Sequence, residues 1–151
     1  MITPQRTTWF LVADGARMQL FESRGMKEQW TLIDNQEAED ARKASRELGR
    51  ERPGRGHKTG PDSRFAMGGA EPHDKIEAAF LGEIAAKLNK AAQREKFDQI
   101  VVAAPPQALG KLRAKFQLQV TAKYIGVFDK DLTNMPEPEL LDYFKERLGR
   151  W

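Results

Sequence analysis

The sequence predicts an α/β protein in which a mixed sheet is covered by helices, with the element order βββ-loop-α-β-α-β-α. Two apolar runs, WFLVA at 9–13 and QIVVAA at 99–104, have the length and composition of buried strands. Between them, the apolar residues of 73–93 recur every fourth position, which is the spacing of an amphipathic helix: Ile76, Phe80, Ile84 and Leu88.

The amino-terminal strands are expected to form an antiparallel meander. Asp14-Gly15 ends the first strand, and this dipeptide suits a tight hairpin turn because both positions tolerate positive φ. The second strand is expected over ARMQLFE at 16–22, and a third, short strand over 30–33.

The carboxyl-terminal half should supply the rest of the sheet and its covering helices. The strand at 98–104 is broken by Pro105-Pro106, and a short helix is expected around Leu109, Leu112 and Phe116. A strand from about 120 to 128 and a final helix with four apolar residues then follow: Leu140, Leu141, Phe144 and Leu148. We predict one domain over 1–151, with a long basic loop at about 36–72.

Composition excludes several classes of protein. The chain has no cysteine, which excludes a disulfide scaffold, thiol catalysis and cysteine-ligated metal. It has no run of about 18 apolar residues and no export signal, so we expect a cytoplasmic protein that does not span a membrane. Trp151 is expected either to lack order or to dock on a partner subunit, and oligomeric state stays open.

The strongest functional signal is the basic segment from Arg42 to Arg64. It holds eight cations and three anions, so it carries +5 while the rest of the chain carries −2. Arginine binds phosphate through two parallel hydrogen bonds, and glycine lets backbone amides approach it. The candidate nucleic-acid contacts are Arg42, Lys43, Arg46, Arg50, Arg52, Arg55, His57, Lys58, Arg64, Gly68 and Gly69. The partners expected from this chemistry are the ribosome, rRNA or tRNA; alternatively, the arginines are solvated or pair with the acidic stretch 137–146.

Four stretches also resemble a known bacterial family, the host attachment proteins, described as "protein required for attachment to host cells". These stretches are TTWFLVADGARMQLFE, RELGRERPGRG, VVAAPPQALGKLRAKF and DKDLTNMPEPEL. That family is thought to resemble the middle domain of archaeal and eukaryotic release factors, which implies a ribonuclease-H-like fold. In those factors a Gly-Gly-Gln loop before a long helix supports peptidyl-tRNA hydrolysis, and Gly68-Gly69-Ala70 stands at the comparable place here.

Binding is therefore a better prediction than catalysis. Ala70 replaces the glutamine, so it has no polar group with which to position water. Asp14 could serve a nuclease, but the central strand ends in Ala103-Ala104-Pro105-Pro106 without a second carboxylate. We predict no catalytic residue, metal or cofactor. Two hypotheses remain: an RNA- or ribosome-associated module, and a protein-interaction factor that contributes indirectly to attachment.

Overall fold

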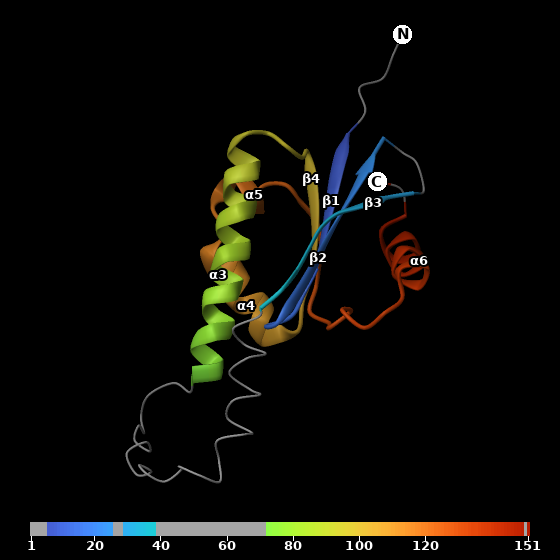
Figure 1. Cartoon of the computed structure of the whole chain (residues 1–151). Helices are drawn as coiled ribbons and strands as arrows, with labels where there is room; N and C mark the ends of the chain where they lie inside the picture. The colour runs from blue at the N-terminus through green and yellow to red at the C-terminus, as the bar shows by residue number, and fades with distance from the viewer. Residues whose placement is uncertain (1–5, 26–28, 39–71, 150) are drawn as a thin grey trace, which may run out of the picture.

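The computed structural model describes residues 6–25, 29–38, 72–149 and 151. In these ranges the chain forms one five-stranded sheet covered by helices on both faces (Figure 1). The strands are β1 (Thr7–Ala13), β2 (Arg17–Arg24), β3 (Thr31–Glu37), β4 (Gln99–Ala103) and β5 (Tyr124–Phe128). The helices are α3 (Pro72–Gln93), α4 (Pro106–Lys115), α5 (Leu118–Thr121) and α6 (Glu137–Leu148).

The strand order is β3-β2-β1-β4-β5. β2 is antiparallel to both β1 and β3, whereas β1, β4 and β5 are parallel to one another. β2 is therefore the one strand of this sheet that runs against the other four. This is the arrangement of ribonuclease-H-like folds, so the predicted mixed α/β fold class is confirmed.

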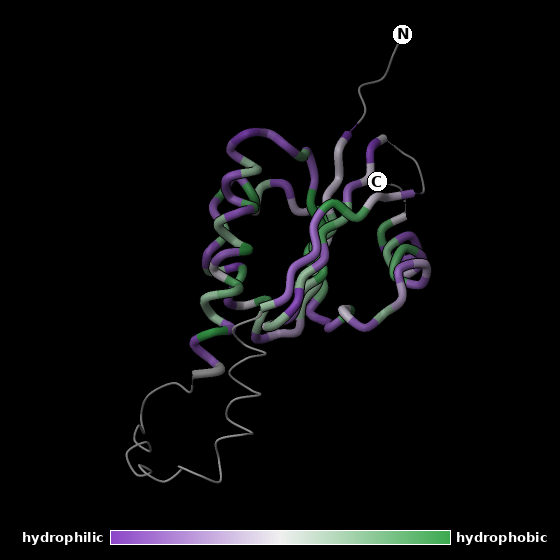
Figure 2. The backbone as a smooth tube through the Cα atoms, in the orientation of Figure 1, coloured by the Kyte–Doolittle hydropathy of each residue, from purple (hydrophilic) through white to green (hydrophobic). Residues whose placement is uncertain are grey.

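The sheet separates two apolar cores because successive side chains of β1 point to opposite faces. Trp9, Leu11 and Ala13 pack under α3, α4 and α5, while Phe10 and Val12 pack under α6. Figure 2 shows hydrophobic positions on the strands and hydrophilic ones interspersed along the helices, as expected for helices with one face in a core. No helix within the described ranges has the length and apolar content needed to cross a membrane.

Two elements differ from their predictions. β3 continues to Glu37, four residues beyond the predicted end at Ile33, because the polar residues after Ile33 suit an exposed edge strand. The strand predicted from 120 begins only at Tyr124, and Leu118–Thr121 forms α5 instead. Val120 is fully buried there as a helical residue, so its apolar, β-branched side chain gave a misleading strand signal.

The prediction that Trp151 lacks order or docks on a partner subunit is wrong, because Trp151 packs into the core of its own chain. Its ring lies 4.9 Å from the ring of Phe10, and its Nε1 donates a hydrogen bond of 3.0 Å to Ser23 Oγ. Only 9% of the residue is exposed. Trp151 is thus part of the core under α6.

Candidate functional site

The carboxyl ends of β1, β3, β4 and β5 and the start of β2 meet at one edge of the sheet, which we call the carboxyl edge. Ligands of open α/β sheets bind at this edge because the strand-to-helix connections gather there. Three of the stretches that carry the family resemblance meet here, through Asp14, Pro105 and Thr133. The carboxyl edge is therefore the candidate functional site within the described residues.

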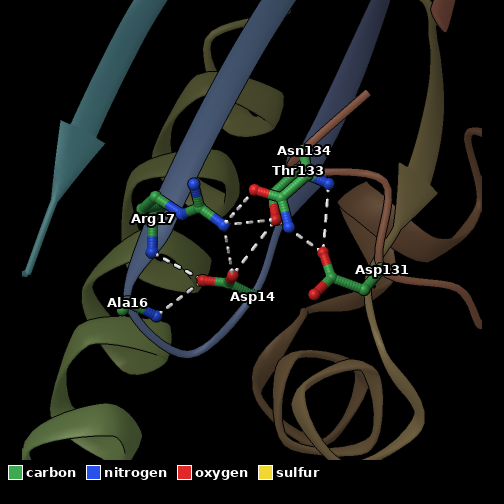
Figure 3. A network of polar contacts seen from close by, with 6 residues as sticks. All are labelled: Asp14, Ala16, Arg17, Asp131, Thr133 and Asn134. Carbon is green, nitrogen blue, oxygen red and sulfur yellow. Dashed lines mark hydrogen bonds and ion pairs between the residues drawn. The ribbon is translucent and has the colours of Figure 1, made fainter. Parts of the chain in front are cut away.

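Asp14 organises the turn between β1 and β2. Its Oδ1 accepts hydrogen bonds from the backbone amides of Ala16 at 2.8 Å and Arg17 at 2.7 Å (Figure 3). Gly15 does not adopt the positive φ that the sequence suggested, since Gly25 and Gly149 are the glycines with positive φ in the described ranges. A Cβ at Gly15 would instead lie 2.5 Å from Oε1 of Glu77, so glycine here leaves room for the Glu77 side chain beside the turn.

Arg17 links this turn to the loop between β5 and α6. Its Nη2 donates to Thr133 Oγ1 at 2.9 Å and to Asn134 Oδ1 at 3.0 Å, and it lies 3.4 Å from Asp14 Oδ2 (Figure 3). The residues come from opposite ends of the chain, 116 to 117 positions apart. The network therefore fixes the position of the β5–α6 loop on the hairpin.

Thr133 lies between two carboxylates. Its hydroxyl oxygen is 2.6 Å from Asp131 Oδ1 and 3.1 Å from Asp14 Oδ2. A hydroxyl has one proton and donates to one acceptor at a time, so the shorter contact assigns that proton to Asp131. Arg17 then supplies the positive charge that faces Asp14.

The hydrogen bonds among Asp14, Arg17 and Thr133 hold these side chains in place, and the arrangement does not resemble a two-metal centre. Such a centre requires several carboxylates that converge on the ions. Asp14 is engaged by two amides and by Arg17. No group of three or more His, Cys, Asp or Glu side chains in the described part of the chain is arranged to hold a metal ion.

A cavity of about 210 Å³ adjoins the edge between the end of β3 and the first half of α3. Its lining consists of Gln36, Glu37, Ala38, Ile76, Ala79, Phe80 and Glu83. Ala38 donates its backbone amide to Ala16 O at 2.7 Å, which anchors this end of the chain beside the β1–β2 turn. Ala38, the last described residue before 39–71, thus lies at the carboxyl edge, and Ile76 in the first turns of α3 lines the same cavity.

All eleven candidate contacts named from the sequence fall within 39–71, outside the described residues. Sequence reasoning missed Arg17, Thr133 and Asn134. It considered Asp14 as a turn residue and a possible nuclease carboxylate, and it used 129–140, which contains Thr133 and Asn134, only for the family resemblance. The signal that could have joined them is that the strands before both turns are parallel, so that their carboxyl ends share one edge.

Comparison with known protein families finds a match over most of the chain. A family model described as "Protein required for attachment to host cells" matches residues 9–144. No curated protein matches the chain.

The solved structures that are similar to this chain include two of low sequence identity. One is an archaeal translation termination factor, aRF1, with 6% identity and a TM-score of 0.44 over 93% of this chain and 38% of that one. The other is the Aquifex aeolicus member of the Ppx/GppA family, with 9% identity and a TM-score of 0.38 over 97% of this chain and 33% of that one. The chain thus spans less than two fifths of either structure. By the match over residues 9–144, it belongs to the family of proteins required for attachment to host cells.

Proposed function

We propose that this protein is a non-enzymatic RNA- or ribosome-associated module that acts as one cytoplasmic domain and binds through the basic segment Arg42–Arg64. The segment carries +5, and the remainder of the chain carries −2. A positive segment on a mildly negative body directs polyanions to one place on the molecule. Ribosome, rRNA and tRNA are the partners whose phosphates suit it.

The observation that carries the proposal is the place where the segment is attached. Ala38 and Ile76, which flank it in the chain, line the same cavity at the carboxyl edge. This is the edge at which open α/β sheets bind their ligands. The described edge itself has more carboxylates than cations, with Asp14, Glu37 and Asp131 around Arg17. The phosphates would therefore be held by the segment.

The test is ribosome co-sedimentation, followed by filter binding with unfractionated tRNA. Changing Arg50, Arg52 and Arg55 to alanine should weaken binding at least about tenfold at low salt, since each phosphate contact contributes to counterion release. The matched control changes Arg24, Lys145 and Arg147 to alanine, which removes the same charge away from the carboxyl edge, at the end of β2 and in the last turns of α6. No binding at low salt, or equal loss in both variants, would contradict the proposal.

A second candidate is a protein-interaction factor that contributes indirectly to attachment, without nucleic acid. The family description favours it. Deleting the gene from its bacterium should then reduce attachment, and complementation with the Arg50, Arg52 and Arg55 variant should restore it fully. If that variant fails to restore attachment, the basic segment is required and the first candidate is favoured.

A further inference from the structure

Charge is segregated across the sheet. From Gln99 to Phe128 the chain has four cations and no carboxylate. From Asp129 to Gly149 it has six carboxylates and three cations. The first stretch includes α4 and α5, which lie on the α3 side, and the second includes α6 on the other side (Figure 1).

The four cations form what we call the α4–α5 basic face: Lys111, Arg113, Lys115 and Lys123. Lys111 and Lys115 are four residues apart, so they share one flank of α4. The stem of Lys115 runs across α3, where its Cδ lies 3.6 Å from the Cβ position of Gly82. None of the four has a carboxylate within ion-pair distance among the described side chains.

Arg113 lies on the other flank of α4, towards β5. Its charge acts on Tyr124, where it partly offsets the rise in pKa that burial causes. Cations therefore border α4 on both sides. Their charges are not neutralised by the described part of the chain.

The crest of α4 between these flanks is low. Gln107 lies on its first turn, but Gly110 and Ala114 occupy the rest of it, and a Cβ at Gly110 would meet nothing within 4 Å. Glycine inside a helix lowers stability relative to alanine, and at Gly110 no packing within the described residues requires it. A low crest between cationic flanks allows a chain of phosphates to come close to the helix.

The chemistry of this face suits a polyanion better than an apolar partner. The large apolar side chains exposed in the described ranges are Leu32, Ile33 and Leu118, and of these only Leu118 belongs to α4 or α5. Protein interfaces have apolar centres, and membrane-surface helices insert apolar residues. One leucine supplies neither.

We propose that the α4–α5 basic face is a second nucleic-acid contact, which binds the phosphate backbone of the RNA that the basic segment holds. This inference rests on the proposed function. Contacts of this kind are independent of base sequence and add to the salt dependence of binding. The two contacts together would fix the orientation of the protein on a folded RNA.

The test measures tRNA affinity against salt concentration. Changing Lys111, Arg113 and Lys115 to glutamine should lower affinity at least about tenfold at low salt and reduce the slope of log K against log salt by roughly 2, at about 0.7 to 0.9 per lost phosphate contact. The control triple is Arg24, Lys145 and Arg147, also changed to glutamine, and it should leave the slope unchanged. Glutamine keeps helix propensity, so both variants should fold.

The outcomes separate the two proposals. Loss of affinity only when Arg50, Arg52 and Arg55 are replaced overturns the second contact and leaves the first. Equal loss from the α4 triple and its control shows a net-charge effect and also overturns the second contact. No binding by the unmodified protein overturns both proposals.

Gly110→Ala provides a readout that a purely structural role would not give. It should raise the Tm by about 2–4 °C, because alanine is the better helix former. If phosphates approach the crest, the same variant should bind tRNA more weakly despite its higher stability. Unchanged affinity in both Gly110→Ala and the α4 triple overturns the second contact.

Discussion

Replacing Trp151 by alanine should remove about 3–5 kcal/mol from the free energy of unfolding. A tryptophan side chain buries roughly 150–250 Å², and at about 25 cal/mol per Å² this is worth about 4–6 kcal/mol as an upper estimate. Trp151 packs against Phe10, and only 9% of its surface is exposed. Measured costs of replacing buried aromatic residues by alanine fall in about the same range.

Trp151→Phe separates packing from hydrogen bonding. Phenylalanine keeps a ring against Phe10 but loses the indole donor that bonds to Ser23 Oγ at 3.0 Å. We expect this variant to lose about 1 kcal/mol from the buried hydrogen bond and a little more from the smaller ring. The phenylalanine variant should therefore retain most of the free energy of unfolding that the alanine variant loses.

Urea unfolding followed by far-ultraviolet circular dichroism measures both variants, because it does not depend on the fluorescence of the removed tryptophan. The measurement should be repeated over a wide range of protein concentration. A loss below about 1 kcal/mol in Trp151→Ala would refute docking into the core, since burial on this scale costs more. A midpoint that rises with concentration, and does so only with Trp151 present, would show docking on a partner subunit instead.

Three further predictions concern other parts of the described chain. Asn89→Ala should cost about 2–4 kcal/mol in urea unfolding, because the Asn89 side chain donates to the Lys115 carbonyl and accepts from the Gln117 amide at the α4–α5 junction, and both would lose their partner. Asn89→Asp should cost at least as much, because it places a carboxylate oxygen against the Lys115 carbonyl oxygen at a buried position. A loss below about 1 kcal/mol in Asn89→Ala would contradict this role. Arg17→Met should lower the free energy of unfolding by about 1–2 kcal/mol, because it frees the β5–α6 loop. Arg24→Met, on the same strand but with a side chain that is 68% exposed, should lower it by less than about 0.5 kcal/mol. Equal losses would show that the network at the carboxyl edge does not add to stability. Burial raises the pKa of Tyr124 above its usual value of 10.0, so the contribution of the neutral phenol to stability is complete below pH 10 and is lost as pH rises through the folded-state pKa. Tyr124→Phe should therefore unfold less readily than the unmodified protein above pH 10. Identical alkaline unfolding curves for the two proteins would contradict this.

The sequence was sufficient for the elements whose side-chain pattern is local. Each of β1, β4 and α3 buries its apolar residues in the core, so the spacing of apolar residues within the element is enough to predict it. The structure has these three elements where they were expected. α5 was missed because a four-residue helix is too short to show a period. Val120 is apolar in either conformation, so burial alone could not distinguish them.

The network at the carboxyl edge could not be derived from local pattern. Arg17 and Thr133 are 116 positions apart, and each has an ordinary role when its own turn is considered. Their meeting depends on the strand order, which places β1 between β2 and β4. Trp151 was misjudged for a related reason, because its partners Phe10 and Ser23 come from the first two strands.

The central place of β1 has a consequence for how the chain is made. β1 pairs with β2 across one tight turn, but its other neighbour, β4, lies 91 positions along the chain, as the pair Thr8 and Gln99 shows. During synthesis the meander can form long before β4 leaves the ribosome, and until then β1 presents an unpaired, apolar edge to other chains. Slow translation between β3 and β4 would lengthen the time for which this edge is exposed. The extent of aggregation should therefore depend on the rate of translation as much as on the stability of the folded protein.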